Sequence, residues 1–426
     1  AAGSSNGQRP CQQCAPVDLV TLFSKFEALA AVGAELAQQG TSPVGVPMRR
    51  VLSPTRAEVD GREVILAGTN NYLGMTMDRD SIEAGHQALE SEGTGTTGSR
   101  MANGTYDSHL ALEREIADLY GMPQAIVFTT GYQANLGTIA TLAGPDDILI
   151  IDADSHASIY DAAKLSAARV FRFRHNDAEN LDKRLGRLGD EAQQCLVVVE
   201  GIYSMLGDQA PLADILAVTK KHGAALLVDE AHSLGVMGHR GCGLAEELGL
   251  LDQVDFITGT FSKSVGTVGG FCVSPHPELA WVRNAMRAYI FTASASPANI
   301  ASSRVALRKL REGTDLRERL WTNARRLYQA LGDMGLKVGP QASPIVAVMM
   351  ESREDTLNAW HTLLDNGVYV NLVVPPAANL NLLRCSVSAA HTPADIDRII
   401  EAYGVVAANL QAGQQAAAAD QACAPR

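Results

Sequence analysis

The feature that most constrains the fold is the alternation of helical stretches with short apolar runs between residues 106 and about 275. After the helical stretch HLALEREIADLY, the runs are AIVFTT, ILIID, VFRF, LVVVEG, AALLVDE, FITGT and GGFCVS. Short apolar runs that alternate with helices are typical of a mostly parallel sheet covered on both faces. We therefore predict an α/β domain with its active site at the carboxyl ends of the strands.

The sequence on either side of this region predicts a second domain and two tails. EVILAGTNNYLGM indicates a strand that runs into a turn, and residues 18–39 carry an amphipathic helical pattern. Long helical segments begin near residue 297, and SPIVAVMM, VYVNLVV and LLRCSVS follow them. The predicted organisation is a disordered tail at 1–16, an N-terminal segment at 17–65, a large α/β domain at 66–297, a small C-terminal α+β domain at 298–410 and a disordered tail at 411–426.

Composition and charge exclude several classes of protein. Of the 426 residues, 46% are hydrophobic, enough to bury a large core. The formal charge of −12 argues against a protein that binds nucleic acid by neutralising its phosphates. The apolar runs are shorter than the roughly 20 residues of a membrane-spanning helix, and the start AAGSSNGQRP lacks the pattern of a signal peptide. We expect a cytoplasmic protein with a small or amphipathic substrate.

The seven cysteines are too few and too scattered for a disulfide framework in a chain of this length, so we expect reduced thiols. Cys11 and Cys14 form a C-x-x-C pair, but no second pair of Cys or His lies near them. We predict no metal site.

Three of the predicted strands end in reactive side chains. The apolar run of ALLVDEAHSLG ends at Asp229, and His232 follows three residues later. The apolar run of ILIIDADSHASIYDA leads to a loop that contains His156. DFITGTFSK ends in Thr260, Ser262 and Lys263. Each of these residues alone is more often a cap, a turn former or a surface group. Together, on strands of one sheet, they predict a common site.

An amine, a carboxylate and two imidazoles suit a pyridoxal phosphate site. The Lys263 amine can form a Schiff base with the cofactor aldehyde, and burial favours its reactive neutral form. Asp229 would keep the ring nitrogen protonated, so that the ring accepts electrons from a carbanion. His156 would stack on the ring, and His232 would contact its phenolic oxygen.

The phosphate of that cofactor needs hydroxyl groups and free backbone N–H groups, which a helix N-terminus after a glycine turn offers. TTGYQANLG supplies such a turn, with Gly131 and Tyr132 at the start of a helical pattern. Thr260 and Ser262 supply hydroxyls beside the lysine. This requirement explains why Lys263 lies among the small and hydroxylated residues of GTFSKSVGTVGG.

Nine stretches of the sequence together resemble the α-oxoamine synthases. They are NNYLGM, GTTGSR, GTYDSHLALEREIADLYG, FTTGYQANLG, DADSHASIYD, VEGIYSMLGD, LVDEAHSLG, GTFSKSVGTVGGF and LLRCSVSAAHT, in that order. The resemblance covers about residues 20–410 and implies the fold-type I, aminotransferase-like architecture. It also implies a homodimeric pyridoxal phosphate enzyme that condenses an amino acid with an acyl-CoA and releases carbon dioxide.

Within this family the chain is most similar to the bacterial serine palmitoyltransferases. Ser262 before the lysine carries this resemblance, together with GTFSKSVGTVGG and YIFTAS. The implied reaction joins L-serine to palmitoyl-CoA and gives 3-oxosphinganine, CoA and carbon dioxide, the first step of sphingolipid biosynthesis. Because the product is a lipid, peripheral membrane contact stays open.

The resemblance also implies roles for individual residues. Lys263 is the expected Schiff-base lysine and the base that removes the α-proton, and His156 also binds the substrate carboxylate. The other expected cofactor contacts are Gly131, Tyr132, Ser204, Asp229, His232, Thr260, Ser262 and, from a second subunit, Thr292. Arg384 and Asn71 are the expected substrate-binding residues.

Two positions depart from the pattern of the serine-using enzymes. Val374 stands where an arginine precedes Pro-Pro in those proteins, and Asn70 stands where they tend to carry tyrosine. The alternatives are a sister synthase that uses glycine or alanine, such as 2-amino-3-oxobutyrate CoA ligase, or an enzyme that takes its acyl group from acyl carrier protein. An aminotransferase of the same fold is a more distant alternative.

Overall fold

The structure is a computed structural model and describes residues 20–38, 42–375 and 380–423. Its contacts divide the chain into two units, residues 1–46 and residues 47–426. In the first unit the described helices are α1 (Val20–Phe23), the 3₁₀ helix η1 (Ser24–Phe26) and α2 (Glu27–Gln38). They agree with the helical pattern predicted at 18–39. The predicted tail at 1–16, with Cys11 and Cys14, lies outside the described residues.

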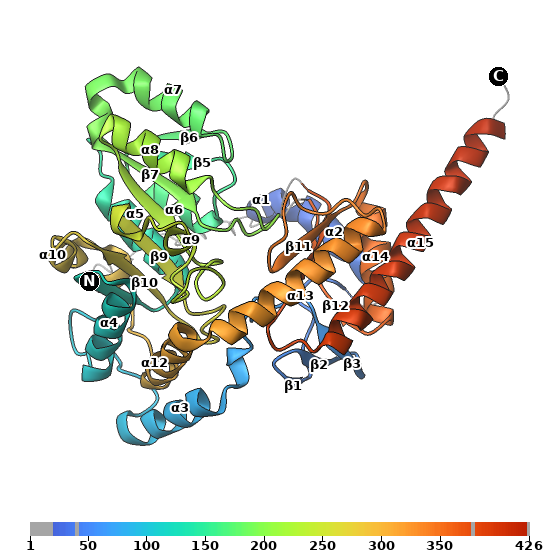
Figure 1. The fold of residues 1–426 in the computed structure, drawn as a ribbon, viewed down its shortest axis with the longest axis horizontal. Coiled ribbons are helices and arrows are strands. Elements are labelled where there is room, and N and C mark those ends of the chain that lie inside the picture. Colours follow the sequence, from blue (N-terminus) through green and yellow to red (C-terminus); the bar gives the residue numbers. More distant parts are fainter. Residues whose placement is uncertain (1–19, 39–41, 376–379, 424–426) are drawn as a thin grey trace, which may run out of the picture. The chain divides into compact units, whose positions relative to one another are not determined.

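The second unit contains a seven-stranded sheet with the strand order β4-β10-β9-β8-β7-β5-β6 (Figure 1). Its strands are β4 (Gln124–Phe128), β5 (Ile148–Asp152), β6 (Arg169–Phe173), β7 (Cys195–Glu200), β8 (Ala225–Asp229), β9 (Phe256–Thr260) and β10 (Gly270–Ser274). Strand β10 is antiparallel to β4 and β9, and the other neighbours are parallel. This confirms the predicted α/β fold with a mostly parallel sheet.

Both faces of this sheet are covered by helices, which explains why its strands lack polar alternation. Ile148 and Ile150 pack on one face, in the cluster that contains side chains of α4 (Asp107–Tyr120), α7 (Ala178–Leu188) and α8 (Leu212–His222). Leu149 and Ile151 pack on the other, with α5 (Gly131–Leu142) and α6 (Ala157–Leu165). Burial of each such side chain stabilises the folded state by roughly 1.5–3 kcal/mol.

Two smaller sheets complete the second unit. One has the order β1-β2-β3-β12, and the other has the order β11-β14-β13. Their strands are β1 (Arg50–Ser53), β2 (Arg56–Val59), β3 (Arg62–Leu66), β11 (Ile345–Met349), β12 (Val368–Tyr369), β13 (Asn371–Val373) and β14 (Leu382–Ser386). The three-stranded sheet is antiparallel and carries Arg384 on its central strand, β14.

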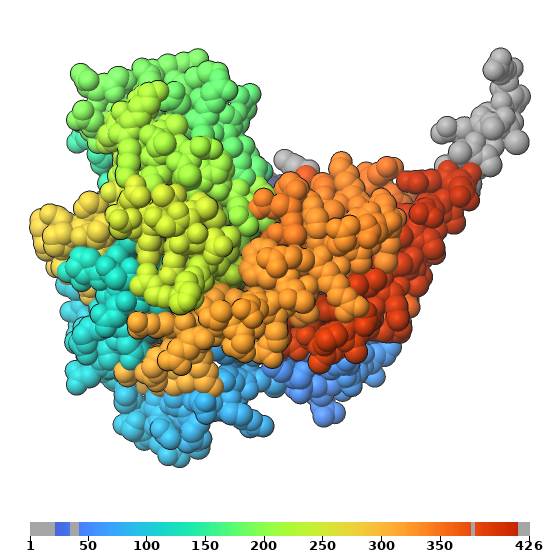
Figure 2. Space-filling model, viewed as in Figure 1, coloured from blue at the N-terminus to red at the C-terminus, as the bar shows by residue number. Residues whose placement is uncertain are grey.

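The remaining α-helices are α3 (Arg79–Glu92), α9 (Leu244–Glu247), α10 (Leu279–Val282), α11 (Arg287–Ile290), α12 (Pro297–Glu312), α13 (Thr314–Asp333), α14 (Arg353–Asp365) and α15 (Pro393–Cys423). Short 3₁₀ helices are η2 (Met75–Met77), η3 (Gly189–Gln194), η4 (Leu251–Gln253) and η5 (Arg283–Ala285). Helices α13 and α15 pack against each other, and in the space-filling view the orange residues of α13 lie beside the red residues of α15 (Figure 2).

The structure differs from the sequence prediction at the C-terminal end. A disordered tail is predicted at 411–426, but α15 continues to Cys423. The reason is local: alanine and glutamine dominate QAGQQAAAADQAC, and both residues favour helix even where packing contributes little. The predicted boundary at 297 between a large and a small domain stays a proposal, because residues 47–426 form one compact unit. Among the described helices, none is long and apolar enough to cross a membrane.

Candidate active site

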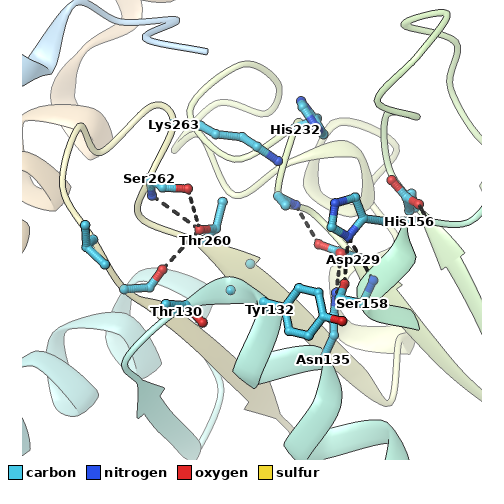
Figure 3. A pocket seen from close by; sticks show the side chains of 16 residues that line it. Thr130, Tyr132, Asn135, His156, Ser158, Asp229, His232, Thr260, Ser262 and Lys263 are labelled. Atoms are coloured by element: carbon cyan, nitrogen blue, oxygen red, sulfur yellow. Dashed lines mark hydrogen bonds between the residues drawn. The ribbon is translucent and has the colours of Figure 1, made fainter. Parts of the chain in front are cut away.

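The carboxyl ends of β8 and β9 and the starts of α5 and α6 enclose a pocket of about 270 Å³ (Figure 3). Eight residues predicted from the sequence line it: Gly131, Tyr132, His156, Asp229, His232, Thr260, Ser262 and Lys263. They come together because parallel strands all end at the same edge of the sheet. The lining also includes Asn135, Ser158 and Glu200, which the sequence analysis did not single out.

Lys263 lies three residues after β9 ends, and its amine points into the pocket toward His156 and Asp229 (Figure 3). Burial lowers the pKa of this amine to about 8, although the carboxyl groups of Asp229 and Glu200 act in the opposite direction. The positive charge of Arg384 lowers the pKa further. The neutral amine, which is the nucleophilic and basic form, is therefore accessible near neutral pH.

Asp229 ends β8 and is 4% exposed. Asn135 Nδ2 donates to its Oδ2 at 2.7 Å, and the backbone N–H of Ala231 donates to its Oδ1 at 2.9 Å. Thr258 donates its hydroxyl to Asn135 Oδ1 at 2.7 Å, which turns the amide N–H₂ of Asn135 toward the carboxylate. These bonds fix the carboxylate of Asp229 as a hydrogen-bond acceptor in the pocket.

His156 is the N-cap residue of α6, and its ring nitrogen Nδ1 accepts from the backbone N–H of Ser158 at 3.2 Å. Burial lowers its pKa, with Lys263 acting in the same direction and Asp229 in the opposite one. A neutral ring whose Nδ1 accepts a hydrogen bond carries its proton on Nε2. The exposed surface of the ring faces the pocket, where it can stack on a planar group (Figure 3).

His232 is buried, and its Nδ1 lies 2.8 Å from the Tyr72 hydroxyl. Burial lowers the pKa of His232 well below its usual value, and the charges of Lys263 and Arg384 lower it further. Burial also raises the pKa of Tyr72. The pair is therefore a neutral imidazole beside a protonated hydroxyl.

The N-terminus of α5 approaches strand β9 closely. The cap residue Thr130 accepts from the backbone N–H of Gln133 at 3.1 Å, and Thr260 Oγ1 lies 2.9 Å from Ser262 Oγ. A Cβ atom at Gly131 would come within 2.6 Å of the Thr260 Cβ, so only glycine allows this approach. The backbone N–H groups of a helix start, with two hydroxyls facing them, fit the phosphate of pyridoxal phosphate.

The hydroxyl of Tyr132 does not belong to this group of phosphate donors. It donates to Asp161 on α6, which raises the pKa of the phenol. Tyr132 therefore offers its backbone N–H and its ring to the pocket. The amine, the carboxylate and the helix start in one pocket fit the predicted cofactor.

Four other predicted residues do not line the pocket. The Thr292 hydroxyl accepts from Gln133 Nε2 at 3.1 Å, and Asn71 Nδ2 donates to the Thr76 hydroxyl at 2.8 Å. Ser204 accepts, through its backbone carbonyl, a hydrogen bond of 2.5 Å from Arg384 Nε. Arg384 is 6% exposed, and its charge acts on Lys263 and His232 although Arg384 is not among the residues that line the pocket.

Glu200 is a buried carboxyl group at the end of β7, and it lines the pocket. Burial raises its pKa well above the usual value, and the negative charge of Asp229 raises it further. The apolar run LVVVE ends in Glu200 as ALLVD ends in Asp229, so the same strand-end rule identifies both carboxyl groups. Asn135 has no such signal, because it lies inside a helix.

Comparison with known proteins places this site in a family. The family described as aminotransferase class I and II matches residues 62–402. The chain is 54% identical over 391 residues to the serine palmitoyltransferase of Caulobacter vibrioides, which covers 91% of this chain and 97% of the relative.

Two solved structures give the same result. The serine palmitoyltransferase of Sphingomonas paucimobilis, with bound pyridoxal phosphate and myriocin, is 52% identical and has a TM-score of 0.89. That match covers 92% of this chain and 99% of the other. The serine palmitoyltransferase of Sphingomonas wittichii is also 52% identical, with a TM-score of 0.88 over 90% of this chain and 98% of the other.

Proposed function

The chain belongs to the class I and II aminotransferases and, within them, to the serine palmitoyltransferases, and on that premise we propose that it condenses L-serine with palmitoyl-CoA. The products are 3-oxosphinganine, CoA and carbon dioxide, so the reaction is the first step of sphingolipid biosynthesis. The observation that carries this proposal is the half-buried lysine, Lys263, in one pocket with the Asp229 carboxylate and the N-terminus of α5.

The cofactor is pyridoxal phosphate, which supplies an aldehyde that reacts with amines and a ring that accepts electrons from a carbanion. Lys263 would hold it covalently. Asp229, oriented by Asn135 and Ala231, would hold the proton on the ring nitrogen. His156 would stack on the ring, and His232 would contact the phenolic oxygen through the nitrogen that Tyr72 leaves free.

The remaining contacts surround the phosphate and the phenolic oxygen. Backbone N–H groups of Gly131 and Tyr132 and the hydroxyls of Thr260 and Ser262 would bind the phosphate. Ser204 would be a further contact near the phenolic oxygen, and Thr292 would reach the site of the second subunit in a homodimer. The homodimer is itself part of the proposal.

Lys263 also has the properties of the base that removes the serine α-proton. With a pKa of about 8, a substantial fraction of the amine is neutral at physiological pH, which is the condition for efficient general base catalysis. After that step a carbon–carbon bond forms to the thioester carbonyl, CoA leaves as the thiol, and the carboxylate departs as carbon dioxide. Arg384, with Asn71, would hold the carboxylate until then.

A sister synthase that uses glycine or alanine is the second candidate, because Asn70 and Val374 differ from the residues expected in serine-using enzymes. Acyl carrier protein is the alternative acyl donor. Val374 is a buried apolar side chain, 6% exposed, and it offers no charged group in place of the arginine. A cytoplasmic location and peripheral membrane contact also stay predictions.

The test is the release of thiol from palmitoyl-CoA by the protein loaded with pyridoxal phosphate, with L-serine, glycine and L-alanine supplied separately. A blank without amino acid corrects for hydrolysis and for the protein's own cysteines. Release with serine supports the proposal, and release only with glycine or alanine moves the function to a sister synthase. A parallel arm with palmitoyl-acyl carrier protein identifies the acyl donor.

Lys263→Ala provides the variant that must lose turnover, and Lys183→Ala is its matched control. Lys183 is an exposed lysine that pairs with Glu179 one helical turn away on α7, so its loss should leave turnover unchanged. Full turnover in Lys263→Ala would refute the assignment of the site.

A further inference from the structure

Arg384 is a buried cation whose described hydrogen bonds all go to neutral acceptors. Its Nε donates to the Ser204 carbonyl at 2.5 Å, and its Nη1 donates to Asn70 Oδ1 and to Ser386 Oγ, each at 3.0 Å. Among the ion pairs of the described residues, none includes Arg384. A buried charge without a counter-charge is unfavourable unless an anion completes its surroundings. The site is therefore prepared for an anionic ligand.

The three hydrogen bonds use the Nε and Nη1 nitrogens of the guanidinium group. Arginine has five N–H donors, of which Nε carries one and each Nη carries two. The three bonds occupy Nε and both hydrogens of Nη1, so Nη2 takes part in none of them. The position of Nη2, the part left for an anion, then depends on the acceptors of Nε and Nη1.

Asn70 is the one of these acceptors that also connects Arg384 to the cofactor pocket. Its Oδ1 accepts from the Tyr72 hydroxyl at 3.3 Å as well as from Arg384, and Tyr72 in turn lies 2.8 Å from His232 Nδ1. Tyr72 also interacts with Arg384 directly, which lowers the pKa of the phenol against the effect of burial. The side chains of Arg384, Asn70, Tyr72 and His232 thus form one connected chain that ends in the pocket lining.

We propose that Asn70 is a positioning residue that orients the Arg384 guanidinium toward the carboxylate of the amino-acid substrate, and so sets how tightly that substrate is held. The inference rests on the proposed function, from which it takes that the substrate is an α-amino acid and that Arg384 holds its carboxylate. An amide oxygen suits this task because it accepts two hydrogen bonds without neutralising the arginine. A carboxylate at the same position would pair with Arg384 and compete with the substrate.

The experiment measures substrate affinity in Asn70→Ala and Asn70→Asp, both loaded with pyridoxal phosphate. L-serine, glycine and L-alanine are titrated without acyl donor, by the visible absorbance of the cofactor and by calorimetry. L-serinol, which has the amine and hydroxyl of serine but no carboxylate, is titrated in parallel. Asn366→Ala is the matched control, because Asn366 caps α14 and its side-chain amide donates to the Thr362 carbonyl within that turn.

We expect Asn70→Ala to bind the amino acids about tenfold more weakly, the equivalent of one lost hydrogen bond to a charged group. Asn70→Asp should bind them more weakly still, although it keeps an oxygen acceptor. Both variants should bind L-serinol as the wild type does, and Asn366→Ala should bind every ligand normally. In turnover, the KM for the amino acid should rise more than kcat falls.

Equal weakening for L-serine and L-serinol would overturn the inference, because the defect would then lie in the cofactor site rather than in carboxylate binding. Wild-type affinity for L-serine in both variants would also overturn it. If the wild type binds amino acids but releases no thiol from an acyl donor, the proposed function fails while the variants still decide the inference. A wild type that binds none of the three amino acids would overturn both.

Discussion

The backbone N–H of His156 donates to the buried carboxyl group of Glu200, with 2.5 Å between the nitrogen and Oε1. This bond joins the first turn of α6 to the end of β7, and it therefore helps to place the imidazole in the pocket. Burial and the negative charge of Asp229 both raise the pKa of Glu200 well above its usual value. The raised pKa favours the protonated form of this carboxyl group, which still offers Oε1 as an acceptor.

A protonated Glu200 predicts that glutamine replaces it with little loss. Glu200→Gln keeps a neutral side chain with one acceptor oxygen, whereas Glu200→Ala leaves the His156 N–H without its partner. We expect Glu200→Ala to lose about 1–3 kcal/mol of unfolding free energy and Glu200→Gln to lose much less. Urea unfolding near pH 7 measures both values. Equal losses in the two variants would mean that Glu200 acts as a charged group.

The pKa of Lys263 predicts where its amine becomes reactive. Burial lowers this pKa from 10.5 to about 8, so the neutral form should dominate above about pH 8 in the protein without cofactor. After reductive methylation with ¹³C-formaldehyde, the NMR resonance of this lysine should titrate near pH 8, well below the ordinary lysine value of 10.5. Lys263→Ala identifies the resonance by its loss. A titration near 10.5 would contradict an enclosed amine.

His175 predicts a stabilisation that is lost at alkaline pH. Its Nδ1 lies 2.8 Å from Asp152 Oδ1 and its Nε2 lies 2.6 Å from Asp208 Oδ2. These hydrogen bonds outweigh the effect of burial and raise the pKa of His175 from 6.5 to about 10. The folded state therefore binds the proton more tightly than the unfolded chain. The stabilisation is complete below about pH 6.5 and disappears as the pH rises to about 10.

Urea unfolding of the wild type and of His175→Gln between pH 6 and 10 isolates this contribution. The difference in unfolding free energy between the two proteins should shrink steadily across that interval. A matched control is His86→Gln, because His86 is exposed and pairs with the exposed Glu90. A difference that stays constant with pH would show that His175 is not protonated between its two aspartates.

Much of this fold follows from short-range patterns in the sequence, and so does most of the pocket. The runs that form β5 and β7 are apolar on both faces because helices cover both, and the residues directly after parallel strands converge on one edge. Asp229 and Lys263 are predictable for that reason. Glu200, which ends the apolar run of β7, is predictable on the same ground.

The contacts that come from distant segments could not be predicted in this way. Arg384 on β14 meets Ser204 after β7 and Asn70 after β3, and no local pattern records which loops a folded chain brings to one guanidinium. Asn135 reaches Asp229 from the middle of α5, where its spacing resembles that of any buried helical residue. Side-chain partners across separate elements depend on tertiary packing rather than on local sequence.

The close approach of α5 to β9 predicts that Gly131 tolerates no side chain. In Gly131→Ala the new Cβ would lie 2.6 Å from the Thr260 Cβ, so the helix start or the strand end must move. We expect a loss of about 1–3 kcal/mol in unfolding free energy, together with weaker cofactor binding, because the displaced N–H groups are the proposed phosphate donors. Fluorescence titration with pyridoxal phosphate and urea unfolding measure the two effects.

Gly186→Ala is the control, since its Cβ would meet no atom closer than 3.7 Å and alanine should stabilise α7 by roughly 0.5–1 kcal/mol. If Gly131→Ala binds the cofactor as tightly as Gly186→Ala does, the helix start is not where the phosphate lies.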